Sequence, residues 1–350
     1  MVSGYPPDSH YRSLIPIPLL NKRRCPPAAS FVFCYNSDMF NSYYLKDLHT
    51  TVFDIETTGL FHSRDCIINA GFCSSMGEVW QNFTEDPADE KRVIEEALER
   101  ICAADAVVTY NGDTFDLPFL QRRAVKYGLC DKLPLLWSVD LYRWLKKYWP
   151  VAPSMKSMSQ KSVEDAMGLA AKRSDEIPGG DCIPLYNYYL QTKDAAAKET
   201  ILLHNADDVK QLARIAWKCT FLPYHDIAMR EGFLFKAGQR KILTKEASFK
   251  KGALQVQAQL DKGLLPVSAY EDQYHLEYDT FSGKAQLSLF PSEQDRFLYV
   301  DAERIPGDKT EIKELPGFHS GYLILAENGE PDPKAVNAAV KTVLSAYFGD

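Results

Sequence analysis

Two acidic residues stand close together in an otherwise apolar stretch at residues 51–60. If this stretch is a β-strand, alternate side chains share a face, so Asp54 and Glu56 project from the same side as Val52. Two carboxylates about 4 Å apart repel each other by roughly 4 kcal/mol at an effective dielectric near 20, so the pair needs a neighbouring cation or a raised pKa. A divalent metal ion is such a cation. The stretch therefore predicts either a metal site or an ordinary edge strand with an acidic, half-exposed face.

Three more residues of the same chemical character lie downstream. Asp116 stands between an apolar run at residues 106–110 and a helical pattern. His204 and Asp208 are four positions apart in a helical segment, so they lie on one face of that helix. The carboxylates are hard oxygen ligands suited to Mg2+ or Mn2+, and two such ions about 3.5 to 4 Å apart can hold the attacking and leaving oxygens of a phosphodiester. With water as the nucleophile, His204 is the side chain suited to take its proton.

Each of these residues also has an ordinary structural interpretation. Asp116 can be a first-turn partner of the helix dipole, Asp208 a solvated helix acid, and His204 a hydrogen-bonded core histidine. A fifth acid, Asp140, stands at the end of a predicted strand, and we expect it to have a structural hydrogen-bonding role.

The elements that must position these side chains form an α/β pattern between residues 48 and 219. Asp113 is expected to cap the helix that carries Asp116, and Ser162 with Asp165 has the pattern of a capping box. After the acidic strand, strands are expected at residues 66–73, 78–83, 106–110 and 136–140, the first two of them antiparallel. Helices are expected at residues 89–102, 113–127, 141–148, 162–168, 184–191 and 194–218.

Past residue 219 the pattern changes to antiparallel β-structure. Strands are expected at residues 254–260, 274–279, 285–290, 297–300 and 322–325, and a last helix begins at Asp332 and Pro333. The predicted organisation is a Pro- and Tyr-rich N-terminal segment at residues 1–47, an α/β domain at 48–219, and a β-rich accessory domain with a C-terminal helix at 220–350.

The net charge, the cysteine pattern and the apolar runs of the sequence narrow the class of protein to which it can belong. The formal net charge of -7 gives no general affinity for nucleic acid, although local basic patches are still allowed. The eight cysteines contain no Cys-x-x-Cys pair, which is typical of reduced thiols in a cytoplasmic protein. The apolar run at residues 14–20 is interrupted by Pro16 and Pro18, so it predicts neither a signal peptide nor a membrane span.

The acidic segments together resemble the DEDD-type 3'-5' exonucleases of the ribonuclease H-like superfamily. Residues 54–60, D-I-E-T-T-G-L, are similar to the first motif of that family, D-x-E-T-T-G-L. Residues 111–116, N-G-D-T-F-D, fit the second, N-x-x-x-F-D, and residues 204–208 stand where the third is expected. The resemblance covers residues 48–219, and residues 174–179 and 184–190 are also similar to a bacterial branch of predicted exonucleases.

This resemblance implies a mixed sheet flanked by helices and a metal-dependent nuclease. The implied reaction is hydrolysis of single-stranded DNA or RNA from a 3' end, with release of nucleoside 5'-monophosphates. Asp54 is expected to bridge two Mg2+ or Mn2+ ions. Glu56 and Asp208 would hold the ion that activates water, and Asp116 would act on the other, with His204 as the general base.

The third motif departs from the family pattern. That motif is usually Tyr with Asp four residues on, or His with Asp five residues on, whereas Val209 stands five residues after His204. The resemblance therefore supports Asp208 as a metal ligand more than it supports His204 as the general base. Asp207 is the alternative ligand.

Nucleic-acid contacts are expected at two places. Thr57, Asn111 and Phe115 belong to the first two motifs, whereas Arg240 and Lys241 belong to a basic stretch at residues 236–251, which a solvated β-hairpin explains equally well.

Two other functions compete with the nuclease. The fold can bind nucleic acid through a silent site, without hydrolysis. Residues 54–58 also resemble the D-x-D-x-T motif of aspartyl-phosphate phosphatases, in which Asp54 would be a covalent nucleophile. That family has Asp at the second position and no use for residues 111–116, which disfavours it.

Overall fold

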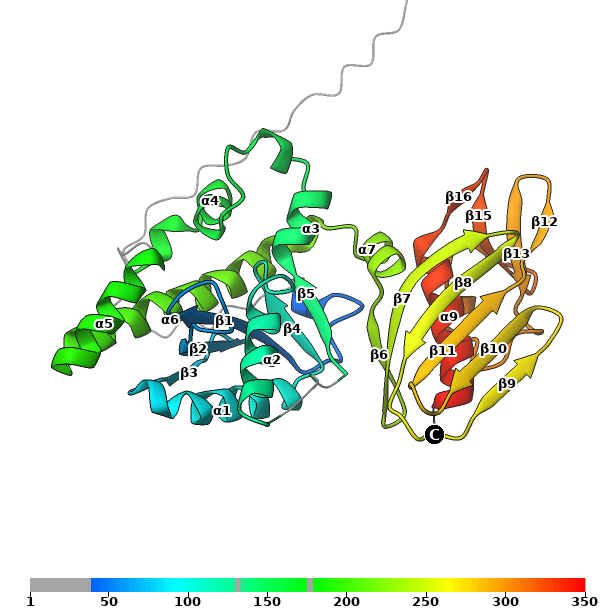
Figure 1. The fold of residues 1–350 in the computed structure, drawn as a ribbon. Coiled ribbons are helices and arrows are strands. Elements are labelled where there is room, and N and C mark those ends of the chain that lie inside the picture. The colour runs from blue at the N-terminus through cyan, green and yellow to red at the C-terminus, as the bar shows by residue number, and fades with distance from the viewer. Residues whose placement is uncertain (1–38, 130–132, 134, 175–178, 350) are drawn as a thin grey trace, which may run out of the picture. The chain divides into compact units, whose positions relative to one another are not determined.

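A mixed five-stranded sheet organises the first half of the described chain (Figure 1). The computed structural model describes residues 39–129, 133, 135–174 and 179–349. The predicted N-terminal segment lies outside this range up to residue 38, as do residues 175–178 of the segment at 174–179. The strands are β1 Thr50–Thr57, β2 Ile67–Ser74, β3 Val79–Phe83, β4 Ala106–Thr109 and β5 Trp137–Asp140, in the order β3-β2-β1-β4-β5.

The central strand, β1, separates two buried layers. It pairs antiparallel with β2 and parallel with β4. Phe53 and Ile55 enter the core beneath α1 and α2, whereas Val52 enters the core beneath α6. Because strand side chains alternate, the two acids of β1 lie on the face toward α6. These helices span α1 Glu90–Ala103, α2 Asp116–Lys126 and α6 Ala195–Lys218.

Two predicted helix starts are wrong. Helix α2 begins at Asp116 with Phe115 in the N-cap position, so Asp113 is not its cap. The Asp113 side chain instead binds Ser138 and Arg143. The cap of α4 is Ser159, which accepts from the Ser162 backbone. The remaining helices of this half are α3 Leu141–Tyr148, α4 Gln160–Ala166, α5 Cys182–Thr192 and α7 Tyr224–Glu231.

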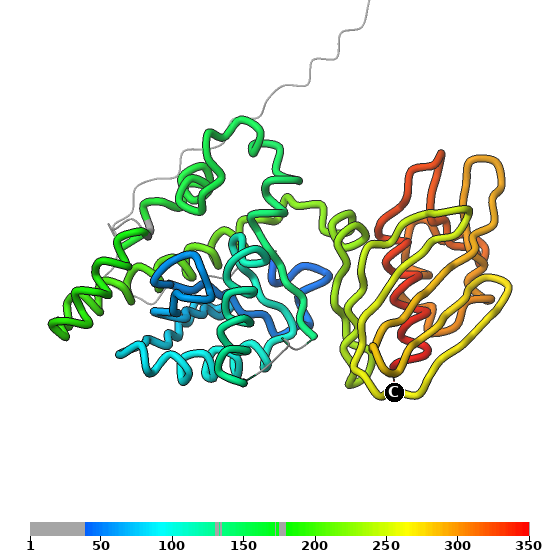
Figure 2. Tube along the Cα trace, viewed as in Figure 1, coloured from blue at the N-terminus to red at the C-terminus, as the bar shows by residue number. Residues whose placement is uncertain are grey.

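The second half is antiparallel β-structure, which Figure 2 follows from green through yellow to red. Its larger sheet has the order β6-β7-β8-β11-β10-β9, with bounds β6 Leu234–Ala237, β7 Arg240–Lys250, β8 Ala253–Gln259, β9 Val267–Tyr270, β10 Tyr274–Asp279 and β11 Lys284–Leu289. The smaller sheet contains β12 Ser292–Gln294, β13 Phe297–Asp301, β14 Phe318–His319, β15 Tyr322–Glu327 and β16 Glu330–Pro331. Leu254, Val256 and Ala258 of β8 are buried, as their alternation predicts.

This half also holds two helices, α8 Thr310–Lys313 between β13 and β14, and α9 Pro333–Phe348 after β16. Helix α9 begins at Asp332 and Pro333, as predicted, and packs on β6, β7 and β15. The Asp332 side chain caps it by accepting from two backbone amides. The predicted fold class, a mixed sheet flanked by helices and followed by a β-rich region that ends in a helix, is confirmed. The predicted domain boundaries stay predictions. Within the described ranges, every helix is too short or too polar to cross a membrane.

Candidate metal centre

The acids of β1 meet the first residue of α2. The Ile55 backbone amide, which lies between Asp54 and Glu56 in the chain, donates to Asp116 Oδ1 at 3.1 Å. This bond ties the start of α2 to the middle of the acidic strand. Asp116 is only 4% exposed, and burial raises its pKa to about 7, with Asp140 adding to the effect.

Helix α6 brings the third motif to the same face. His204 Nε2 lies 3.3 Å from Asp208 Oδ2, because positions four apart share one helix face. The same ring nitrogen lies 3.7 Å from Glu56 Oε1 on β1. Asp207 lies elsewhere and accepts from the Ser174 backbone amide. The geometry therefore favours Asp208 over Asp207 as the acid that faces β1.

Asn205 is a site residue that sequence reasoning missed. Its Nδ2 donates to Asp54 Oδ2 at 2.9 Å, and its Oδ1 accepts from Asn69 and Gln81 at 2.7 and 3.0 Å. These two donors fix which end of the amide faces Asp54. The residue is completely buried. The only feature of the sequence that indicated a role at the site was its position between His204 and Asp208 of the third motif. Gly71 leaves room for the amide, since a Cβ there would lie 1.9 Å from Asn205 Oδ1.

Three carboxylates form a compact oxygen cluster. Ligand oxygens of Asp54, Glu56 and Asp208 all lie within 4.8 Å of one another. Burial raises the pKa of Asp54 well above its usual range, and the charges of Asp116, Asp208 and Glu56 raise it further. Asn205 opposes this rise by donating to the carboxylate. A hard divalent cation would relieve the same repulsion, so the donor set fits Mg2+ or Mn2+.

A half-buried arginine contacts the cluster, and sequence reasoning missed it as well. Arg173 Nε and Nη2 donate to Glu164 Oε2 and Oε1 at 2.6 and 2.7 Å, and Nη2 also binds Asp208. The side chains of Arg173 and Glu164 are 9% and 1% exposed. A bidentate pair of this kind fixes the guanidinium plane. Nothing in the local pattern signals this contact, because Arg173 lies 35 positions before Asp208.

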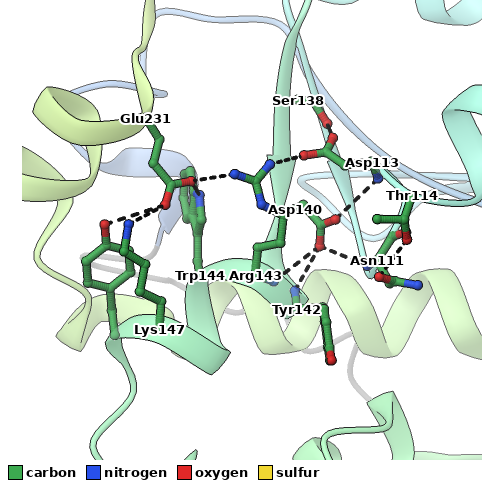
Figure 3. Close-up of polar contacts among 11 residues, drawn as sticks. Asn111, Asp113, Thr114, Ser138, Asp140, Tyr142, Arg143, Trp144, Lys147 and Glu231 are labelled. Carbon is green, nitrogen blue, oxygen red and sulfur yellow. Dashed lines mark hydrogen bonds and ion pairs between the residues drawn. The ribbon is translucent and has the colours of Figure 1, made fainter. Parts of the chain in front are cut away.

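The loop that delivers Asp116 is held from the start of α3. Asp140 accepts from the backbone amides of Asn111 and Asp113 at 2.9 and 3.2 Å, and also from the first turn of α3 (Figure 3). Figure 3 also shows Arg143 between the carboxylates of Asp113 and Glu231. The structural role expected for Asp140 is therefore confirmed.

The residues expected to contact nucleic acid fall into two groups. Asn111 has a left-handed φ of 66°, and its side chain accepts from the Thr114 hydroxyl at 2.8 Å. Asn tolerates this conformation better than most residues, so Asn111 of the second motif allows the backbone to turn before α2. Phe115 packs on Phe119 with ring centroids 5.5 Å apart, and the Thr57 hydroxyl donates to the Gly59 carbonyl at 2.8 Å.

The basic pair on β7 is engaged within the protein. Lys241 Nζ lies 2.8 Å from Asp105, which also pairs with Lys236 at 2.6 Å. Arg240 donates to the Phe348 carbonyl at 3.3 Å. A nucleic-acid strand would have to compete with these contacts.

Comparisons with known proteins place this site in a family context. A family model described as RNase_H superfamily matches residues 51–220. A DNA polymerase from Pyrococcus glycovorans is 31% identical over 139 residues, which are 33% of this chain and 17% of that protein. A DNA polymerase from Methanocaldococcus jannaschii is 32% identical over 99 residues, 25% of this chain and 6% of that protein. The chain thus spans a small part of both relatives.

The solved structure of the family B DNA polymerase from Pyrobaculum calidifontis aligns with a TM-score of 0.41 and 22% identity, over 49% of this chain and 24% of that one. The family model alone covers all the motif residues, from Asp54 to Asp208. It confirms, at the level of the superfamily, the resemblance drawn from those motifs. Residues 51–220 of this chain are therefore a domain of the ribonuclease H superfamily.

Proposed function

We propose that this protein is a metal-dependent 3'-5' exonuclease that hydrolyses single-stranded DNA or RNA. One observation carries the proposal. Oxygen atoms of Asp54, Glu56 and Asp208, which come from a strand and a helix far apart in the sequence, gather within 4.8 Å, and Asp116 is bonded to the same strand. An ordinary acidic edge strand would not collect acids from two helices.

The proposed roles follow from the positions of the acids. Asp54, Glu56 and Asp208 would hold the ion that activates water, and Asp54 together with Asp116 would hold the other. Bound Mg2+ or Mn2+ would make water more acidic and stabilise negative charge on the phosphodiester oxygens. The protein's own contribution is to keep these oxygens in place, because Asn205 and the β1 backbone each bond one acid.

His204 is the proposed general base. Its imidazole is 2% exposed and lies within 4 Å of Glu56 and Asp208, so it adjoins the place where the attacking water would be held. Asp208 would then have two roles. Its Oδ2 lies 3.3 Å from the His204 ring nitrogen Nε2, and it also contributes an oxygen to the cluster. This arrangement favours a histidine that is oriented by a carboxylate.

The proposed substrate is a nucleic-acid strand with a free 3' end. The motifs at residues 54–60 and 111–116 support this choice by their resemblance, and the two relatives, both DNA polymerases, favour a nucleic acid. Thr57, Asn111 and Phe115 are the proposed contacts beside the acids, with Arg240 and Lys241 farther along the chain. A cytoplasmic location is part of the same proposal, because the eight scattered cysteines, with no Cys-x-x-Cys pair, are typical of reduced thiols.

The test compares the wild type with Asp54→Asn on 5'-labelled single-stranded DNA and RNA, in Mg2+ or in Mn2+. Glu199→Gln, an exposed acid on α6, is the matched control for the loss of one carboxylate. We expect products that shorten from the 3' end with the wild type and the control. The variant should lose at least about 100-fold in rate, in line with the weight of electrostatic contributions at such sites.

The outcome also separates the competing functions. Hydrolysis that persists in Asp54→Asn would contradict the proposal. Binding of the strand without cleavage by the wild type would favour a silent binding module. A phosphorylated Asp54 trapped from a phosphate monoester would favour the phosphatase instead.

A further inference from the structure

One buried thiol beside the acidic cluster has no part in the proposed reaction. Cys182 is the first residue of α5 and is completely buried. Its sulfur, a ring nitrogen of His204 and a carboxylate oxygen of Glu56 all lie within 4.8 Å of one another. A thiol, an imidazole and a carboxylate thus converge on one point.

A structural role alone explains part of this arrangement. Cys182 belongs to a small apolar cluster with Tyr186 and Ile201, and a buried cysteine often behaves as a small hydrophobic residue. Packing, however, does not require an imidazole and a carboxylate beside the sulfur. Of the cysteines in the described ranges, Cys182 is the one that shares a possible ligand group with a histidine and an acid.

The ligand chemistry differs from that of the oxygen cluster. Thiolate, imidazole and carboxylate together suit borderline cations such as Zn2+ and Co2+, whereas carboxylates alone suit Mg2+ and Mn2+. Ligand atoms that bind one zinc ion at about 2.0 to 2.3 Å lie at most about 4.3 Å from one another. A small rotation of the side chains would therefore bring the three ligand atoms around one ion.

We propose that Glu56, Cys182 and His204 form a second metal position, selective for a cation of the Zn2+ or Co2+ type and sharing Glu56 with the oxygen cluster. On binding, the thiol releases its proton to solvent and the thiolate sulfur bonds to the metal. Since Glu56 and His204 would then be engaged by this ion, its binding inhibits hydrolysis. That last consequence rests on the proposed function, whereas the site itself does not.

Cobalt spectroscopy tests the site directly. The full chain, with Mg2+ in excess and no nucleic acid, is titrated with one equivalent of Co2+. We expect a thiolate-to-cobalt charge-transfer band in the near ultraviolet, which Zn2+ abolishes by displacing the cobalt. The band should disappear in Cys182→Ser and persist in Cys102→Ser, a control that removes an exposed thiol. No band in the wild type, or an unchanged band in Cys182→Ser, would overturn the proposal.

A second measurement covers the case in which Cys182→Ser does not fold. Zinc K-edge X-ray absorption of the Zn2+-loaded Cys102→Ser protein should give one sulfur ligand at about 2.3 Å. A shell of oxygen and nitrogen alone would refute the site.

Inhibition is measured separately in a hydrolysis assay with Mg2+. Zn2+ should inhibit the wild type at least about tenfold more strongly than Cys182→Ser, because the sulfur ligand is lost. Equal inhibition would refute the regulatory consequence. A protein that shows the cobalt band but hydrolyses nothing would retain the metal site and lose the proposed function.

Discussion

Replacing Arg173 by glutamine should change folding stability and metal affinity in opposite directions. The guanidinium donates to both oxygens of Glu164 and also contacts Asp208, an acid of the oxygen cluster. It therefore stabilises the protein without metal. It also places a positive charge where a divalent cation would bind.

The loss of stability comes from the partner that is left behind. Glu164 is 1% exposed, and removal of one member of a buried ion pair typically costs about 3–5 kcal/mol. Gln160 still donates to Glu164 Oε1 at 3.1 Å, and the new glutamine amide can donate as well. We therefore expect the lower end of that range, about 3 kcal/mol in the free energy of unfolding. Glu164→Gln combined with Arg173→Gln should recover most of it, because no buried charge is left unpaired.

The gain in metal affinity comes from removing a repulsive charge. A unit charge and a divalent cation about 4 Å apart repel each other by roughly 8 kcal/mol at an effective dielectric near 20. Asp208 is 19% exposed, so solvent and the rearranged side chains screen part of this energy. A remainder of about 1.4 kcal/mol corresponds to a tenfold lower Kd for Mn2+.

Urea unfolding and calorimetric titration with Mn2+ measure the two effects in the same variants. Arg230→Gln is the matched control, since Arg230 forms an exposed pair with Asp226, at 2.8 Å, and should affect neither quantity. Weaker or unchanged Mn2+ binding by a folded Arg173→Gln protein would refute the reasoning. It would mean that the guanidinium supports the metal position by orienting Asp208, and that this orientation outweighs the repulsion.

Three further outcomes depend on single contacts. Gly71→Ala would displace the Asn205 amide, so Mn2+ affinity should fall at least about tenfold in a calorimetric titration, and unchanged affinity would show that the amide is dispensable. Burial raises the pKa of Glu90, but hydrogen bonds from Arg123 and others outweigh burial and lower it. The Glu90 carboxylate should therefore stabilise the wild type by about 3 kcal/mol over Glu90→Gln at pH 7, and this stabilisation should be lost as the pH falls below about 4. Urea unfolding at pH 7 and below about pH 4 should show the difference in unfolding free energy between the two proteins shrink. Asp140→Asn should cost about 1–2 kcal/mol in urea unfolding and slow hydrolysis, because Asp140 uses both oxygens to accept from the loop before α2 and asparagine keeps only one acceptor; an unaltered rate would exclude that coupling.

The local geometry of the site was predictable because it follows from short periods. The alternation of a strand places Asp54 and Glu56 on one face, and a spacing of four on a helix does the same for His204 and Asp208. These patterns involve only a few consecutive residues. Burial on the opposite face of β1 then decides which layer the acids enter, and the apolar Phe53 carries that information in the sequence.

The partners of the acids were not predictable for the opposite reason. Asn205 and Asp54 are 151 positions apart, and their contact depends on how α6 crosses the sheet. Arg173 lies in an irregular segment with no periodicity to place it. Long-range polar contacts leave no local pattern, so only the assembled fold identifies them.

The misplaced cap shows how such contacts override local preference. Asp113 is a good N-cap residue by type, but Arg143 and Ser138 bind its side chain and the helix begins three residues later. Asp140, from a different strand, holds the intervening backbone. The tertiary contacts therefore set where α2 begins, and with it the position of Asp116.

Asp54, Asp116 and Asp208 of the proposed site each have an internal donor, which helps the fold to accommodate so much negative charge. Asn205 gives Asp54 a neutral donor, the β1 backbone does the same for Asp116, and Arg173 gives Asp208 a positive charge. In small domains whose folding depends on metal, the ligands come together only when the ion binds. Here the ligands are already held by packed strands and helices, so the free energy of cation binding is not needed to assemble them. Of these partners Arg173 alone carries a full charge, so we expect it to compete with a cation, whereas the neutral donors from Asn205 and the β1 backbone hold their acids in place.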